Sequence, residues 1–357
     1  MSDHPAPHPS STTDAEASQS GVTRKLVAVL LGLTAVVTLM LCAFALPSVN
    51  GGPHKVPIGV SGPQAAARSL EKTLGGDEWD VTAYDSAEAL ASAVEDREIT
   101  GGLALAPEGI DVYTATAGAP VATGALTALA NSVAAEQQTK PTVHELAPFP
   151  VDDPRGAGFS SAALPLIFGG MIPAVLLTRL FPGHAGLRTR LAGAALFSLL
   201  AGAAVTAVLQ WGTGSLAGDY GITALGLSLG MAALSLTFLG LEALAGMAGM
   251  AGMAGMAGFG IGAAVMMLLG NPLSGLGTGP YWLPGGWAAV GQFLPPGASG
   301  SLLRANAFFD GTGAGTPALN LTAWVALGLA LILIADRRGA KVLRTGATSA
   351  KSVPTAA

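Results

Sequence analysis

Long stretches of this chain carry no charge, and they restrict its possible folds more than any other feature. The first covers residues 26–46, is 21 residues long and follows Arg24 and Lys25. A helix of about 20 apolar residues is long enough to span the hydrocarbon core of a bilayer. Only 11% of the 357 residues are charged, whereas a soluble domain carries about 25%. The sequence therefore predicts a membrane protein.

Six membrane-spanning helices are expected. The first lies within residues 24–47, and residues 1–23 before it, rich in Ser, Thr and Pro, predict a disordered cytoplasmic tail. An alternative is a signal peptide, because Ala43-Phe44-Ala45 resembles a cleavage site. The apolar run is longer than the 7–15 residues typical of such peptides, which favours a retained helix. The other expected spans lie at about 162–178, 190–209, 221–242, 250–270 and 319–335.

The fourth and fifth of these spans are joined by a repeat of Met, Ala and Gly over residues 246–258. Its pairs Ala248/Gly252 and Ala251/Gly255 have the spacing of small residues that lets two helices approach closely in lipid. The repeat therefore predicts a packing helix or a spacer.

Residues 48–160 have a different character, because charges return and short strands alternate with helices. Ser86 is a suitable N-cap for one of these helices. The Pro107-Glu108-Gly109 turn predicts a hairpin. Strands are expected at 56–60, 79–84, 102–106, 110–114 and 142–146, and helices at 64–74, 87–97 and 121–138. This pattern predicts a small α/β domain inserted between the first and second spans.

The distribution of Lys and Arg predicts the orientation, because cytoplasmic loops are enriched in cations. Cations flank the first span, lie between the second and third, and follow the sixth. They are Arg24, Lys25, Arg179, Arg188, Arg190, Arg337, Arg338, Lys341, Arg344 and Lys351. The loop 210–220 has none, and the loop 271–318 has only Arg304. Both termini, including the tail 337–357, are therefore expected in the cytoplasm, and the α/β domain is expected to be extracytoplasmic.

The 271–318 segment is too apolar and too rich in Gly and Pro for an ordinary exposed loop. Its aromatic residues suit a membrane interface, and irregular backbone at that depth must be buried or line a cavity. We expect re-entrant or interfacial segments in the 161–336 bundle that either line an exit path or plug the outer end of the bundle. The candidate path residues are Asn271, Pro272, Ser274, Trp282, Trp287 and Gln292.

Four charged residues near the expected cytoplasmic face are candidates for contact with a partner. Glu242 lies at the end of a span, where an acidic group is costly and suggests a function. Arg179, Arg188 and Arg190 are placed to contact another protein or anionic lipid head groups. A role as topology determinants is the simpler explanation of these arginines.

The sequence does not predict an enzyme. It contains no phosphate-binding GxxxxGK[ST] loop. Gly297-Ala298-Ser299-Gly300 matches a GxSG pattern, but none of the five His residues lies in a span to act as a base. A single cysteine excludes a disulfide framework, and the net charge of -5 argues against nucleic acid as a partner. No cofactor and no metal site is expected.

Two groups of motifs resemble the permease subunits of ABC-2 type exporters, in the YhgE/Pip-like branch that carries an extracellular domain after the first helix. The first group is YDSAEAL at 84–90 and GGLALAPEG at 101–109. The second is GNPLSG at 270–275, WLP at 282–284, GQFLPPG at 291–297 and AFFDG at 307–311. The resemblance covers about residues 25–340.

The resemblance implies a permease that works as a dimer with a separate ATPase subunit, which binds the ATP, and exports a lipid-like or amphipathic molecule across the cell membrane. In that family the ATPase-coupling helix usually lies where this chain has only the short loop from Arg179 to Arg190. This departure favours an alternative, a membrane-anchored binding or scaffold protein whose α/β domain recognises an envelope component or a partner.

The predicted topology can be tested by cysteine accessibility in a Cys42→Ser background. Thr100→Cys and Thr345→Cys are expected to react with a membrane-impermeant thiol reagent from opposite sides, because the α/β domain and the C-terminal tail are placed across the bilayer. Labelling of both cysteines from the same side would contradict the topology.

Overall fold

The computed structural model describes residues 11–106, 109–136, 138–183, 185–246 and 253–350, and the chain forms two compact units, 1–46 and 47–357. Helix α1 (Ser11–Val49) accounts for the described part of the first unit. It begins well before residue 24, so the segment from Ser11 onward, expected as a disordered tail, is helical. Its large aliphatic side chains, from Leu26 to Leu46, are exposed.

Five helices of the described chain are long and apolar enough to cross a membrane, consistent with a membrane protein. They are Gly21–Val49, Ala157–Leu180, Leu187–Gly212, Tyr220–Ala245 and Gly315–Arg338. The sixth expected span, 250–270, is not confirmed. Its apolar described part, Gly258–Gly270, is shorter than a bilayer crossing needs. The small pairs Ala248/Gly252 and Ala251/Gly255 of the Met-Ala-Gly repeat lie wholly or partly outside the described residues.

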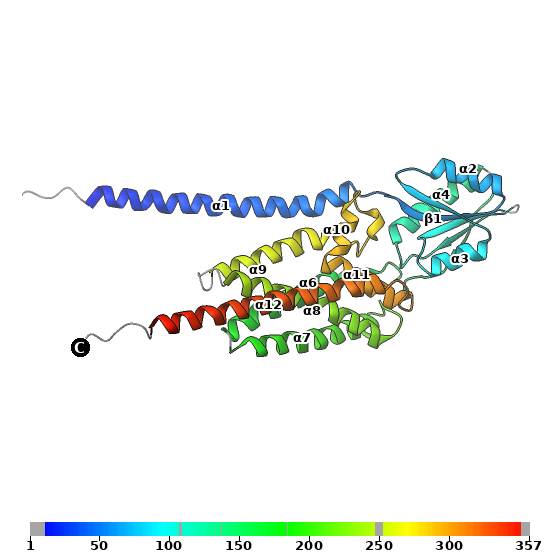
Figure 1. The fold of residues 1–357 in the computed structure, drawn as a ribbon. Helices are drawn as coiled ribbons and strands as arrows, with labels where there is room; N and C mark the ends of the chain where they lie inside the picture. Colours follow the sequence, from blue (N-terminus) through cyan, green and yellow to red (C-terminus); the bar gives the residue numbers. More distant parts are fainter. Residues whose placement is uncertain (1–10, 107–108, 137, 184, 247–252, 351–357) are drawn as a thin grey trace, which may run out of the picture. The chain divides into compact units, whose positions relative to one another are not determined.

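The helices of the second unit form a bundle around one central helix, α8 (Tyr220–Gly246) (Figure 1). The helices that contact α8 are α6 (Ala163–Leu180), α7 (Leu187–Ala207), α9 (Met253–Val265), α11 (Pro295–Phe308) and α12 (Gly315–Ala350). The short helix α5 (Ala157–Ser161) precedes α6, and the π-helical turns η1 (Val208–Gly212) and η2 (Met266–Gly270) extend α7 and α9. Two-thirds of the apolar window of α8 is buried.

Glycines allow these close helix contacts. A Cβ on Gly170 of α6 would overlap the Leu234 side chain, and one on Gly328 of α12 would lie 2.5 Å from the Leu236 carbonyl carbon. On α7, a Cβ at Gly202 would overlap Ser228. In lipid the hydrophobic effect does not drive helices together, so close backbone packing of this kind carries much of the association. The abundance of glycine, 50 residues, therefore has a structural cause in the bundle.

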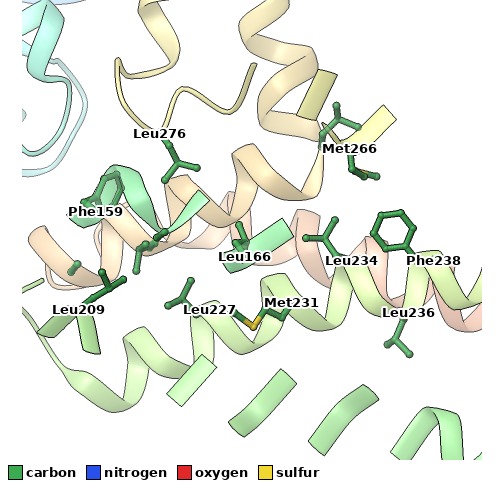
Figure 2. Close-up of a cluster of buried hydrophobic side chains, with 14 of the residues drawn as sticks. Phe159, Leu166, Leu209, Leu227, Met231, Leu234, Leu236, Phe238, Met266 and Leu276 are labelled. Carbon is green, nitrogen blue, oxygen red and sulfur yellow. The ribbon is translucent and has the colours of Figure 1, made fainter. Parts of the chain in front are cut away.

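A continuous cluster of buried apolar side chains fills the space between these helices. Figure 2 shows its row along α8, from Leu227 through Met231 and Leu234 to Phe238, with Phe159 and Leu276 at one end of the cluster. Side chains of α6, α7, α11, α12 and η2 also belong to the cluster. This core holds the bundle together away from the glycine contacts.

The α/β part is a five-stranded mixed sheet with the strand order β2-β1-β3-β4-β5. Its strands are β1 (Val56–Ser61), β2 (Trp79–Tyr84), β3 (Gly101–Ala106), β4 (Gly109–Thr114) and β5 (Thr142–Glu145). Neighbouring strands are parallel except for the antiparallel pair β3–β4. Helices α2 (Gln64–Leu74) and α4 (Pro120–Glu136) cover one face and α3 (Ala87–Glu95) the other (Figure 1). These elements lie within a few residues of their expected ranges, and Ser86 caps α3 by accepting a hydrogen bond from the Ala89 amide.

The sheet packs directly on the bundle rather than being separated from it by a linker. Phe149 and Phe159, which follow the last strand, belong to the buried cluster of the bundle. Phe309, after α11, packs into the core on the α3 face of the sheet. Backbone bonds from Gly52 and His54 to the carbonyls of Trp282 and Tyr281 add to this junction.

The segment 271–318, expected as re-entrant or interfacial, contains several short helices at the sheet end of the bundle. They are η3 (Pro272–Ser274), η4 (Pro280–Trp282), α10 (Trp287–Phe293) and α11. Helix α11 is almost entirely buried against α8, α10 and α12, so this part of the segment is a core element of the bundle.

The central packing can be tested with two alanine substitutions in helices. Gly328→Ala is expected to lower stability by about 1–3 kcal/mol, because a methyl group would collide with the α8 backbone at Leu236. The matched control Gly260→Ala, where nothing lies within 4 Å of the new methyl group, is expected to be neutral or slightly stabilising, since Ala favours helix. Thermal unfolding in one detergent compares the two. Equal melting temperatures would contradict the packing described here.

Candidate functional site

A row of buried polar side chains runs along α8. Thr223, Ser228, Ser235 and Thr237 are all buried. Ser228 bonds back to its own helix at the Ala224 carbonyl, and Ser235 donates across to the Gly170 carbonyl of α6 at 2.9 Å. The hydroxyl oxygens of Thr223 and Thr237 have no hydrogen-bond partner within the described chain. A buried polar group without a partner is costly, so these side chains need an explanation beyond packing.

Helix α11 carries further polar groups against Gly226 and Gly230 of α8, whereas Ser228 faces α7 and Ser235 faces α6. Ser299 packs at Gly230 of α8, and Asn306 packs at Gly226 and donates to the Ile222 carbonyl at 3.2 Å. The Ser299 hydroxyl and the Asn306 side-chain oxygen are buried and have no partner in the described residues. The interface between α8 and α11 is therefore a polar lane inside an otherwise apolar bundle.

The most unusual group of the bundle is Arg304, also on α11. Its side chain is only 2% exposed. Its Nη2 atom donates to the Leu276 carbonyl at 2.7 Å, and its guanidinium carbon lies 4.8 Å from the centre of the Phe159 ring. The Nε atom is buried and has no hydrogen-bond partner in the described part of the chain.

Phe159 is held under Arg304 by the start of α5. The Asp153 carboxylate accepts hydrogen bonds from the amides of Ala157 and Gly158, at 2.8 Å and 2.7 Å. Burial alone would raise the pKa of Asp153, but these bonds, with further ones from Phe159 and Ser215, lower it. The carboxylate is therefore ionised at neutral pH and fixes the turn that positions the ring.

A second arginine lies at the junction of the sheet with the bundle. Arg97 follows α3, donates to the Thr312 carbonyl at 3.0 Å and lies 4.9 Å from the centre of the Phe309 ring. Burial lowers the pKa of Arg97. Burial, with a further contribution from the positive charge of Arg97, lowers the pKa of Arg304.

The structure links most of the residues expected to line a path. Ser274 donates to the Asn271 carbonyl at 2.7 Å and so closes the turn that contains Pro272. Gln292 donates to the Ser274 carbonyl at 2.9 Å. Ser301 of α11 donates to the Gln292 side-chain oxygen. These hydrogen bonds attach the loop to α11. The polar groups of Ser274 and Gln292 are therefore engaged within the protein.

The two tryptophans of that set lie elsewhere. Trp282 packs against the core on the α2 and α4 face of the sheet. Trp287, at the start of α10, is about half exposed. The structure therefore does not bring them together with Asn271, Ser274 and Gln292.

The four charged residues that were expected to contact a partner lie at the other end of the bundle. Arg190, near the start of α7, lies 3.6 Å from the Glu242 carboxylate near the end of α8, and it donates to the Gly183 carbonyl. The structure thus brings Arg190 and Glu242 together as an ion pair, and Arg179 and Arg188 are exposed at the same end.

The sheet offers two further clusters. The imidazole of His144 lies 3.0 Å from the Asp111 carboxylate and stacks on Tyr113. A groove of about 410 Å³ opens beside α2 and the edge strand β2. Its lining residues are Lys55, Arg68, Glu71, Lys72, Gly75, Gly76, Trp79, Asp80 and Val81. The charged side chains of this groove suit a polar ligand more than an apolar one.

Sequence reasoning missed the polar lane and Arg304. Arg304 is visible in the sequence as the single cation of 271–318, and a charge isolated in an apolar segment was the available signal. Ser299 was noticed only as part of a GxSG pattern and Asn306 gave no signal, because their contacts on α8 are distant in sequence. No protein-family model, curated protein or solved structure matches this chain, so its function is inferred from its residues and fold.

The pair of Arg190 and Glu242 can be tested by a double-mutant cycle. Arg190→Gln and Glu242→Gln are each expected to lower stability, with a coupling energy of about 0.5–3 kcal/mol, because each change leaves a half-buried charge unpaired. The exposed control Arg188→Gln is expected to change stability by less than about 0.5 kcal/mol. Denaturation of the four variants measures the coupling. Losses that simply add would show that the pair is not coupled.

Proposed function

We propose that this chain is the permease subunit of an ABC-2-like exporter, and that it forms the membrane path for a lipid-like or amphipathic molecule. A separate ATPase subunit supplies the energy. The observation that carries the proposal is the polar lane between α8 and α11. Polar side chains inside a membrane bundle are costly and suggest a function, and the side-chain oxygens of Thr223, Ser299 and Asn306 are buried without a hydrogen-bond partner in the described chain.

In this proposal the chain crosses the cell membrane six times, with α9 and η2 as the fifth crossing. The contacts of α9 support it. Gly258 packs against Ala245 and Leu241, Gly262 against Leu241 and Phe238, and Gly270 against Pro296. The segment therefore runs antiparallel to α8 and returns the chain to the sheet end of the bundle.

The two ends of the bundle differ in a way that supports the proposed orientation. Exposed or partly exposed aromatic residues gather at the sheet end, including the stacked pair Trp211 and Tyr220 and the pair Phe293 and Trp324. The opposite end carries Arg179, Arg188, Arg190, Arg337 and Arg338. Aromatic residues favour membrane interfaces, and cations favour the cytoplasmic side. The sheet is thus proposed to be extracytoplasmic and both termini cytoplasmic.

The cationic end is also the proposed docking surface for the ATPase. Arg188 is exposed beside the pair of Arg190 and Glu242. An ATPase subunit that binds ATP must contact the permease from the cytoplasmic side. The participation of a second permease subunit follows from the resemblance of the sequence motifs to the exporter family.

Capture of the tagged full chain from its native membranes tests this function. We expect a nucleotide-binding subunit to be recovered with it, and we expect Arg188→Glu to reduce that recovery several-fold by reversing a docking charge. The matched control is Arg155→Glu, an exposed arginine near the sheet end, which is expected to leave recovery unchanged. Intact chain recovered without any nucleotide-binding subunit would contradict the exporter.

A membrane-anchored binding protein is the second candidate function, and the groove beside α2 and β2 favours it. There the sheet would recognise a polar envelope component through Lys55, Arg68 and Lys72, and the bundle would serve as an anchor. Loss of envelope binding on Arg68→Glu, with no nucleotide-binding partner, would select this function over export.

A further inference from the structure

The guanidinium of Arg304 is a buried charge with no counter-charge. Within the described chain no carboxylate lies within ion-pair distance of it, and the nearby charge that acts on it, Arg97, is also positive. Taking a charge out of water costs several kcal/mol even after the protein relaxes. One neutral carbonyl and one aromatic face recover only part of that cost. An unpaired charge of this kind is expected only where something else neutralises it.

The unpartnered Nε atom of Arg304 lies on the edge of the guanidinium that binds an anion through two hydrogen bonds. The Nε and Nη2 atoms form one edge of the guanidinium, and this edge matches the oxygens of a carboxylate or phosphate. In Arg304 the Nη2 atom is engaged by the Leu276 carbonyl, and the Nε atom is unpartnered. The edge is therefore half occupied, by a neutral acceptor.

The Leu276 carbonyl belongs to a loop that this bond holds on the bundle. The loop turns at Gly275 and Gly279, both with positive φ, and the Gly279 amide bonds to the Gly275 carbonyl at 2.8 Å. The Leu276 side chain packs over Gly300, one turn before Arg304 on α11. Because a bidentate pair between a guanidinium and an anionic group is stronger than a single hydrogen bond to a neutral carbonyl, an anion would displace the carbonyl and release this attachment.

We propose that Arg304 binds the anionic head group, phosphate or carboxylate, of a lipid-like molecule, and that this head group replaces the Leu276 carbonyl on the guanidinium edge. The identification of that molecule as exported cargo rests on the proposed function, whereas the binding itself does not. The site would hold one anionic group where α11 meets the Leu276 loop and Phe159.

The purified full chain in nanodiscs of neutral phosphatidylcholine, with or without added phosphatidylglycerol, tests the proposal. Ligand binding to the folded state raises the melting temperature, and we expect phosphatidylglycerol to raise it by about 2 °C or more. In Arg304→Met, which keeps the length of the side chain and removes the charge, we expect that rise to disappear. In phosphatidylcholine alone this variant is expected to be as stable as the native chain or more so, because an unpaired buried charge has been removed.

Three controls separate the proposal from its rivals. Arg188→Gln, on the surface at the other end of the bundle, is expected to keep the rise. Arg304→Lys is expected to keep only part of it, because an ammonium cannot bind two oxygens side by side. Inorganic phosphate alone is expected to give no comparable rise, and an equal rise would overturn the assignment to a lipid head group.

Arg304→Met tells the two roles of this arginine apart. If the variant loses the same stability in every lipid composition, Arg304 only anchors the loop and the proposal is overturned. If phosphatidylglycerol stabilises the native chain through Arg304 but no ATPase is captured, the anion site stands and the exporter does not.

Discussion

Close contact of backbones at α8 is the constraint on which the bundle depends. Helices in lipid gain little from the hydrophobic effect, so their association rests on packing. Glycines at Gly170, Gly202 and Gly328 let three neighbouring helices reach α8 at distances that a side chain would prevent. Among the buried polar residues of α8, Ser228 and Ser235 bond to backbone carbonyls, whereas the hydroxyls of Thr223 and Thr237 have no partner in the described chain. The position of the functional groups thus follows from the packing.

Helix α11 connects that packing to function. It is buried on nearly all sides, and it presents Ser299 and Asn306 to α8 and Arg304 to the loop near Leu276. A helix so enclosed would be expected to be wholly apolar, because polar groups inside a bundle reduce stability unless they are satisfied. Their presence means that the bundle keeps buried polar side chains at a cost in stability.

Local patterns were sufficient to predict the sheet. The alternation of short strands with helices and the cap at Ser86 are signals carried by neighbouring residues, and the observed elements lie within a few residues of the expected ones. The segment 271–318 could not be predicted in the same way. Its Gly and Pro content indicates irregular backbone, but the burial of α11 depends on α8 and α12, which are distant in sequence. The start of α1 was also misjudged, because the polar composition before residue 24 does not prevent a helix.

The sequence by itself determined that this chain has helices able to cross a membrane, that a sheet of alternating strands and helices interrupts them, and that its cations gather near particular helix ends. These properties follow from composition and short-range periodicity, which act along the chain. Only the tertiary structure decided which polar residues meet. It paired Arg190 with Glu242, placed Ser299 and Asn306 against α8, and buried Arg304 over Phe159 with no carboxylate of the described residues paired to it. The energy of a charge depends on what surrounds it in space, and its neighbours in the sequence do not reveal that.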